Sequence, residues 1–246
     1  MNSSFRVRSV VISVVSGLLL GGCVSAPSVD ADRNATGRMK RIALLSIPEP
    51  SEVPVANIGG GAGAFGLVGG LIQADVNLGQ AEQFAQYLKS KKLDVARHFD
   101  EEVTRSLREA GYDVILVTDQ RPKIAADGKS DDYSGVHVDA DAILSIWSKS
   151  FGYISPPNST HYQPSGVVAV RLLDARTKAD IYFKTYVVGW KLHIKESIYL
   201  ETDEKYRYRS IDKFKESEDE AIEGLFEAEH LISQHVAQDL GSTPTP

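Results

Sequence analysis

Residues 167–194 read VVAVRLLDARTKADIYFKTYVVGWKLHI and set the architecture of this chain. Two runs rich in β-branched and aromatic residues, 167–173 and 181–194, flank the short polar link 174–180. Residues of these types are enriched in strands, and a short polar link is typical of a hairpin. A third run of the same kind, 142–151, precedes them and is joined to them by a longer loop. We therefore predict three consecutive antiparallel strands.

Helical periodicity lies on both sides of these strands. Between residues 80 and 110, apolar residues recur at spacings of three and four, with a break near 90–94 where Asp94 is a candidate N-cap. Gly111 then has the position of a glycine that ends a helix. Residues 217–240 begin with Ser-Glu-Asp-Glu, which matches a capping box, and carry one apolar face. We predict two consecutive helices before Gly111 and one long helix near the C-terminus.

Two more apolar runs, 40–47 and 112–117, predict further strands, whereas 196–215 has no clear period and is expected to be irregular. The order of elements predicts an α+β fold. We expect a single mixed or antiparallel sheet of about five strands with helices packed on it, plus a glycine-rich insertion after the first strand. One domain is expected over residues 39–241, followed by a disordered tail at 242–246.

Residues 1–22 have the composition of an export signal. Arg6 and Arg8 form a short basic region, and 10–20 is an apolar run of about eleven residues, which suits a signal peptide and is short for a membrane-spanning helix. The next residues resemble the lipobox of bacterial lipoproteins, and they are Leu20, Gly21, Gly22 and Cys23.

This resemblance implies that Cys23 carries lipid, and that Leu20, Gly21 and Gly22 are recognised by the lipoprotein signal peptidase. Acyl chains on the mature N-terminus give stable membrane attachment. Position 24 is valine, not the aspartate that retains lipoproteins at the inner membrane, which implies the outer membrane with the domain facing the periplasm. Residues 23–38 are rich in Ser, Ala, Asp and Asn, so we expect a flexible tether.

Charge and composition exclude several function classes. Loss of 1–22, which holds two arginines and no acid, changes the formal charge from −6 to −8, and this disfavours nucleic acid as a partner. The single cysteine allows no intrachain disulfide. The six histidines lack metal-ligand spacing and are expected to be surface groups. We expect no metal, no cofactor and no enzyme, because no Gly-x-Ser-x-Gly or comparable catalytic motif occurs.

The stretch 57–73 is a glycine-rich insertion, with seven glycines between Gly59 and Gly70. Part of it matches the spacing of glycines in a dinucleotide-binding fingerprint. That site requires a strand directly before the glycines, and none is predicted here. Small residues also recur at intervals of four, which in membrane helices permits close approach. The segment is therefore either a flexible or packed loop, or a site of membrane contact or self-association. The residues of this second interpretation are Gly59, Ala62, Gly63, Phe65, Gly66 and Gly70.

Two stretches, 141–146 and 168–177, resemble parts of small α/β domains in envelope lipoproteins. Those proteins include the curli secretion lipoprotein, flagellar outer-membrane lipoproteins and the N-terminal domain of the Tol-system propeller protein. Where these families commonly have glycine after the threonine, this chain has Lys178. The resemblance implies a non-enzymatic domain that docks on partners or self-assembles.

These observations favour an outer-membrane-anchored periplasmic lipoprotein that serves as an accessory or assembly subunit of an envelope complex, with protein partners and no catalytic role. One alternative is an oligomeric pore or secretion-channel lipoprotein that uses the glycine-rich segment. Another is a periplasmic enzyme. A strip of tyrosine and basic residues between 199 and 214 is either a partner-facing surface or packing at the sheet edge.

Overall fold

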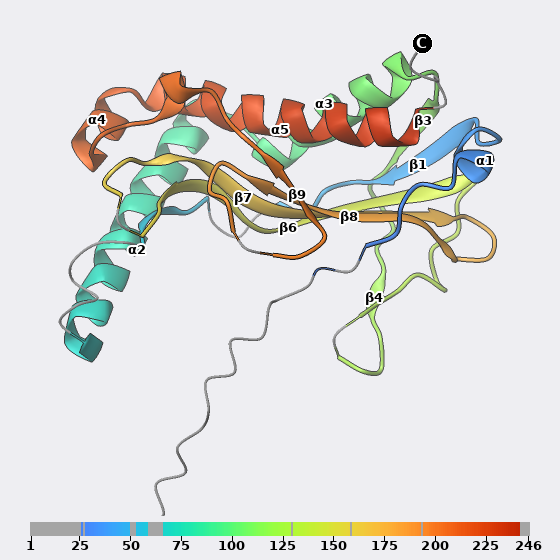
Figure 1. The fold of residues 1–246 in the computed structure, drawn as a ribbon, viewed down its shortest axis with the longest axis horizontal. Coiled ribbons are helices and arrows are strands. Elements are labelled where there is room, and N and C mark those ends of the chain that lie inside the picture. Colours follow the sequence, from blue (N-terminus) through green and yellow to red (C-terminus); the bar gives the residue numbers. More distant parts are fainter. Residues whose placement is uncertain are drawn as a thin grey trace, which may run out of the picture.

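The computed structural model describes residues 26–241, except 27, 50–52, 59–65, 129, 158 and 193, and for 66–76 and 149 it describes the backbone alone. Figure 1 shows the helices and strands of the chain in sequence colours. The elements are α1 (Arg33–Thr36), β1 (Arg41–Leu45), β2 (Val55–Asn57), α2 (Gly66–Ser90), α3 (Val95–Glu109), β3 (Asp113–Val117), β4 (Lys123–Ile124), β5 (Asp131–Asp132), β6 (Ala142–Ser155), β7 (Gln163–Asp174), β8 (Asp180–Val188), β9 (Ser197–Leu200), the 3-10 helix η2 (Glu204–Tyr206), α4 (Ile211–Glu216) and α5 (Glu218–Leu240).

The main sheet has seven strands in the order β3-β1-β6-β7-β8-β9, with β2 added beside the far end of β6. β6, β7 and β8 are antiparallel, as the sequence predicts, whereas β3, β1 and β6 run parallel, and β9 is parallel to β8. The predicted α+β class and mixed sheet are confirmed, but the expected number of five strands is wrong. β2 and β9 contain three and four residues, and strands this short show no readable alternation.

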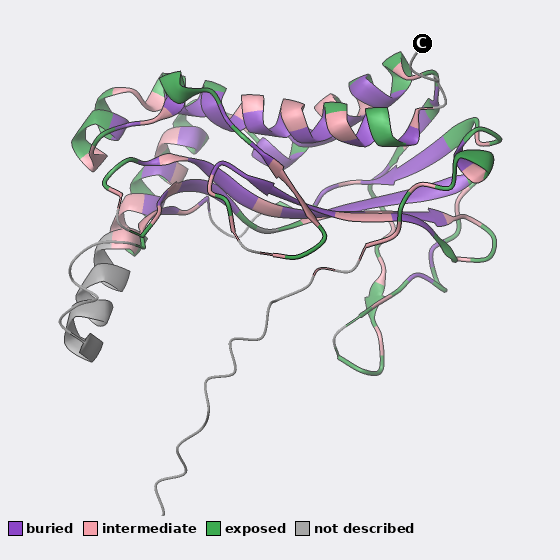
Figure 2. Cartoon of the chain, in the orientation of Figure 1, coloured by how far each residue is buried: buried purple, intermediate pink, exposed green. Residues whose placement is uncertain are grey.

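Helices α3 and α5 lie side by side on one face of this sheet, and α2 packs beside β2 at one end (Figure 1). The buried residues form a layer between these helices and the strands (Figure 2). The centre of this core contains Ile42, Leu44, Phe84, Val103, Leu107, Leu144, Tyr153, Val170, Leu172, Tyr186, Phe214, Leu225, Ile232 and Val236.

The predicted helix boundaries are largely confirmed. The Asp94 carboxylate accepts a hydrogen bond from the Arg97 amide at 2.9 Å, and so caps α3. Gly111, just after α3, has φ +96°, the conformation expected of a glycine that ends a helix. The predicted capping box at Ser217 is wrong, because its side chain makes no capping hydrogen bond. Its amide instead bonds to the Phe214 carbonyl, since α4 ends directly before it.

The predicted strand 181–194 is too long, because the chain turns at Gly189, where φ is +75°. The stretch 196–215 is not irregular, since it holds β9, η2 and α4. Its aromatic residues Tyr206, Tyr208 and Phe214 are buried, which confirms the packing interpretation of the tyrosine strip. Aromatic spacing without period here reflects short elements that pack in different directions.

The N-terminal segment is ordered against the domain from residue 28 onward, where the sequence predicts a flexible tether. Val29 forms an antiparallel bridge with Phe183, at the part of the β8 edge that β9 leaves unpaired. Thr36, in α1, is only 2% exposed. The unpaired backbone of an edge strand attracts an extended segment, and here the chain's own N-terminal segment satisfies it. The proposed leader 1–22, Cys23 and the tail 242–246 lie outside the described residues.

The glycine-rich insertion is only partly described. Its part 59–65, which includes Gly59, Ala62, Gly63 and Phe65, lies outside the described residues. Gly66 and Gly70 belong to α2, so the helix begins inside the stretch for which a loop was one interpretation. Among the helices that can be described, none combines the length and apolar character needed to cross a bilayer. A role of this segment in membrane contact or self-association stays a prediction.

Candidate functional site

Among the described elements, no layer of helices covers the second face of the main sheet (Figure 1). Near β1, a small apolar cluster on this face is covered by Tyr133 and Val136 from the long connection between β3 and β6. Further along β6, β7 and β8, the face opens into a groove of about 560 Å³. An apolar sheet face that lacks a covering layer is a candidate binding surface.

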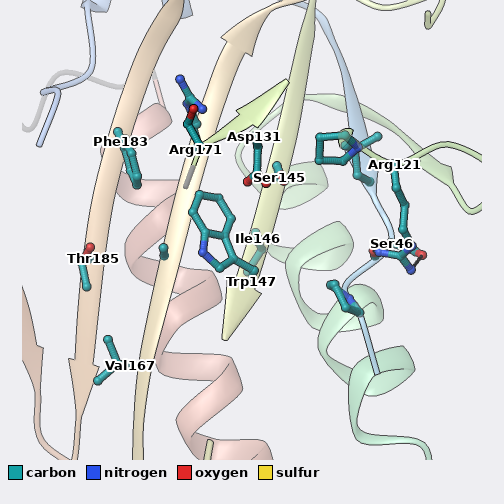
Figure 3. Close-up of a pocket in the computed structure, with 15 residues that line it drawn as sticks. Ser46, Arg121, Asp131, Ser145, Ile146, Trp147, Val167, Arg171, Phe183 and Thr185 are labelled. Carbon is teal, nitrogen blue, oxygen red and sulfur yellow. Dashed lines mark hydrogen bonds between the residues drawn. The ribbon is translucent and has the colours of Figure 1, made fainter. Parts of the chain in front are cut away.

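The floor of the groove comes from the strands and its rim from loops (Figure 3). Because side chains alternate along a strand, Val167, Ala169 and Arg171 of β7 line the groove, while the even-numbered neighbours belong to the helix-covered core. β6 and β8 continue the floor. The other lining residues that matter here are Trp147, Phe183, Thr185, Ser46, Arg121 and Asp131.

Arg171 on this floor is held by an acidic partner and two aromatic rings. Its Nε and Nη2 atoms donate to the two Asp180 carboxylate oxygens at 2.5 and 3.0 Å. The guanidinium lies 5.3 Å from the Tyr133 ring centre and 5.5 Å from that of Phe183. Trp147 packs on Phe183 with ring centres 5.8 Å apart. A paired arginine between aromatic rings gives a preformed surface that loses little side-chain freedom on binding.

Arg121 stands at the groove rim with its charge directed at neutral atoms. Its guanidinium donates to the Ser46 carbonyl at 2.8 Å and to the Ser46 hydroxyl at 3.1 Å. Its positive charge also affects a nearby carboxyl group, that of Asp100. Burial raises the pKa of Asp100 to about 6, while the hydrogen bond from the Ile47 amide and the charge of Arg121 act to lower it. Within the described part of the chain, Arg121 makes no direct ion pair. The rim therefore has guanidinium donors available for an incoming carboxylate.

A second, more apolar hollow of about 250 Å³ continues the groove toward the ends of β6 and β8. Val167 lines both hollows, so they share one wall. The second is lined by Ile154, Trp190 and Leu192, and by Ile58, which is 47% exposed. The open face is thus one surface, with Arg121 and Trp147 at one end and Trp190 at the other.

A separate polar cluster joins α3 and α5 on the opposite side of the sheet. His98 Nδ1 lies 2.6 Å from an oxygen of Glu229, a residue with 0% exposure. Burial raises the pKa of Glu229 to about 7, against the lowering effect of His98. Burial acts to lower the pKa of His98, but the hydrogen bond with Glu229 leaves it raised. The contact between these two side chains ties the two helices together.

This cluster corrects, for His98 and His230, the expectation that the histidines are solvated surface groups, whereas His137 and His161 are exposed as expected. His98 stacks on Phe226 with ring centres 3.6 Å apart, and His230 lies 3.0 Å from Glu102. The helix pairing that brings α3 against α5 creates these contacts, which no sequence spacing reveals. Over the residues that can be described, no three His, Cys, Asp or Glu side chains are grouped to hold a metal ion.

Sequence reasoning missed the groove. The sequence predicts Trp147, Arg171 and Phe183 only as strand residues, although an arginine inside an apolar strand is a signal for an open face. The lipobox residues Leu20, Gly21, Gly22 and Cys23 lie outside the described part, so their role stays a prediction.

No protein-family model matches the chain, and no curated protein is similar to it. The solved structures that resemble it include the following three. The PelC dodecamer from Paraburkholderia phytofirmans is 13% identical with a TM-score of 0.36, over 90% of this chain and 96% of that chain. Protein XCC0632 from Xanthomonas campestris is 9% identical with a TM-score of 0.41, over 87% of both chains. Lipoprotein GNA1162 from Neisseria meningitidis is 12% identical with a TM-score of 0.24, over 59% of this chain and 79% of that chain. These values are too low to assign the chain to any of those groups.

Proposed function

We propose that this chain is a lipoprotein of the bacterial envelope, anchored through Cys23 at the outer membrane and facing the periplasm. It serves as a non-catalytic accessory or assembly subunit that holds a segment of a partner protein on the helix-free face of its sheet. The observation that carries the binding role is the open groove, where aromatic and arginine side chains lie on a face that no described helix covers. The lipobox sequence carries the anchoring role.

The composition of the groove supports a protein partner. Trp, Tyr, Phe and Arg are the residues most enriched at the centre of protein interfaces. Trp147, Phe183 and Arg171 form such a centre, and Ser46, Thr185 and the rim loops surround it with polar groups. A groove of about 560 Å³ accepts several side chains but no whole domain. The occupant is therefore an extended segment rather than a folded surface.

Charge further defines this segment. Arg121 has guanidinium donors at the rim, and among the described residues these donors bond only to neutral acceptors. A charge-assisted bond from arginine to a carboxylate is among the stronger hydrogen bonds in proteins. We therefore assign the groove to an apolar polypeptide segment of an envelope partner, with an aspartate, glutamate or C-terminal carboxylate that reaches Arg121.

Replacement of the anchoring residue tests the first half of the proposal. Cys23→Ser is expected to remove the chain from the outer-membrane fraction and to leave the leader uncleaved, because the thiol is the atom that accepts lipid. Cell fractionation and intact-mass measurement check this, with Ser25→Ala as the matched control that keeps the lipobox. A Cys23→Ser chain that matures and fractionates like the parent would refute the anchoring.

A photoreactive group in the groove tests the second half. Benzoylphenylalanine in place of Trp147 is expected to crosslink one envelope protein in intact cells, whereas the same group at the exposed Glu101 on α3 is not. Arg121→Glu is expected to lower the yield about tenfold or more, since it removes a charge-assisted hydrogen bond of about 1.5–3 kcal/mol.

The control for charge is Arg176→Glu, which makes the same change at an exposed turn. Equal losses from the two substitutions would contradict a specific carboxylate at Arg121. An adduct with a second copy of this chain would contradict the partner assignment and favour self-association. Mass spectrometry of the adduct identifies which protein is joined.

A further inference from the structure

The described chain begins beside the loop that connects β8 to β9. The Ala26 amide donates to the Lys195 carbonyl at 3.0 Å. Val29 and Phe183 exchange two backbone hydrogen bonds, at 2.8 and 2.9 Å. Because this bridge is antiparallel, the residues before Val29 run toward the carboxyl end of β8, where the loop begins (Figure 1). Lys184 fixes the same segment through Ser28 Oγ at 2.8 Å and Asp30 Oδ1 at 2.5 Å.

The length of chain between Ala26 and the proposed anchor is short. Cys23 precedes Ala26 by three residues. Even a fully extended chain of that length spans only about 11 Å. When acyl chains on Cys23 enter a bilayer, Ala26 must therefore lie within about 11 Å of Cys23. The Lys195 carbonyl lies a further 3.0 Å from the Ala26 amide. Among the described loop residues, Lys195 is the one with a backbone hydrogen bond to this segment.

The loop has the composition of a membrane-interface segment. Residues 189–196 read GWKLHIKE, with one tryptophan, two lysines and a single acid. Trp190 and Leu192 line the apolar end of the groove, while Lys191 and Lys195 are exposed. Tryptophan is enriched at the headgroup level of membranes, and lysine is attracted by anionic headgroups. Glu196 is the only opposing charge in the loop sequence.

We infer that the loop 189–196 rests on the lipid surface, with Trp190 at the headgroup level and helices α3 and α5 directed away from the bilayer. This orientation rests on the proposed anchoring through Cys23. It places the Trp190 end of the open face at the membrane and leaves the Trp147 end accessible to a partner. The short anchor thus determines which part of the groove remains free.

The two tryptophans of the chain provide a matched pair of probes. Trp147→Phe leaves Trp190 as the only tryptophan, and Trp190→Phe leaves Trp147. The acylated chain is reconstituted in vesicles of phosphatidylethanolamine and phosphatidylglycerol, part of which carry bromine on the acyl chain close to the headgroup. Trp190 emission is expected to fall by roughly half or more, and Trp147 emission by less than about a tenth, because only the first tryptophan reaches the interface.

A chemical anchor separates this inference from acylation itself. The chain that begins at Cys23 holds every described residue and a single thiol, so it can be coupled to a maleimide lipid in the same vesicles. Selective quenching of Trp190 in the coupled chain supports the orientation. Equal quenching of both tryptophans overturns the orientation alone. Shielding of Trp190 from iodide in the absence of vesicles also overturns it, because that result indicates that a second copy of the chain covers Trp190. An unmodified N-terminus on the chain from cells overturns the anchoring, and with it this orientation in the cell.

Discussion

The substitution Phe214→Ala is expected to lower the free energy of unfolding by about 3–5 kcal/mol, the usual range for a buried phenylalanine. Phe214 is 1% exposed and belongs to α4. Its ring centre lies 4.8 Å from that of Tyr153, 5.1 Å from Phe84 and 5.7 Å from Tyr208. Three separate segments therefore meet on this one side chain, and its removal leaves a cavity that none of them can fill alone.

Urea unfolding followed by far-UV circular dichroism measures this effect. The control is Ile124→Ala, which removes an apolar side chain that is 75% exposed and is expected to change stability by less than about 0.5 kcal/mol. A loss below about 1 kcal/mol for Phe214→Ala would contradict the aromatic cluster, because a well-packed site does not tolerate so large a deletion.

The second large effect is expected from Gly189→Ala, at the turn that ends β8. A Cβ atom at this position would lie 1.8 Å from the Pro164 carbonyl oxygen, and the backbone has φ +75°. The left-handed conformation costs about 1–2 kcal/mol for an L-residue, and overpacking adds about 1–3 kcal/mol. We therefore expect a loss of about 2–5 kcal/mol in unfolding free energy.

Gly128→Ala separates these two contributions. Gly128 also has a positive φ, +65°, but no heavy atom lies within 4 Å of a Cβ built there. Its substitution is expected to show the conformational cost alone, about 1–2 kcal/mol. Equal losses of unfolding free energy at the two glycines, in the same urea titration, would contradict the close approach of Gly189, at the end of β8, to Pro164 of β7.

The local signals of the sequence correctly predicted the helices around Asp94 and Gly111, the hairpin at 174–180 and the class of the fold. Lys178 illustrates the limit of such signals. The envelope-lipoprotein hairpins that residues 168–177 resemble commonly have glycine after the threonine. Here that position is Lys178, which adopts φ +61°. Its ammonium donates to the Val136 carbonyl at 2.7 Å, a residue distant in sequence. A tertiary contact accompanies a conformation that a lysine rarely adopts.

From the sequence alone come the long, periodic elements and the leader-like N-terminus, because hydrophobic periodicity and capping act over a few neighbouring residues. The groove, the edge position of Val29 and the burial of Phe214 depend instead on which strands and helices lie side by side. Trp147 and Phe183 are read as ordinary strand residues until the helices are seen to cover only the other face of the sheet. Which face of a strand is left open is a property of the layers packed around it, and no local pattern encodes it.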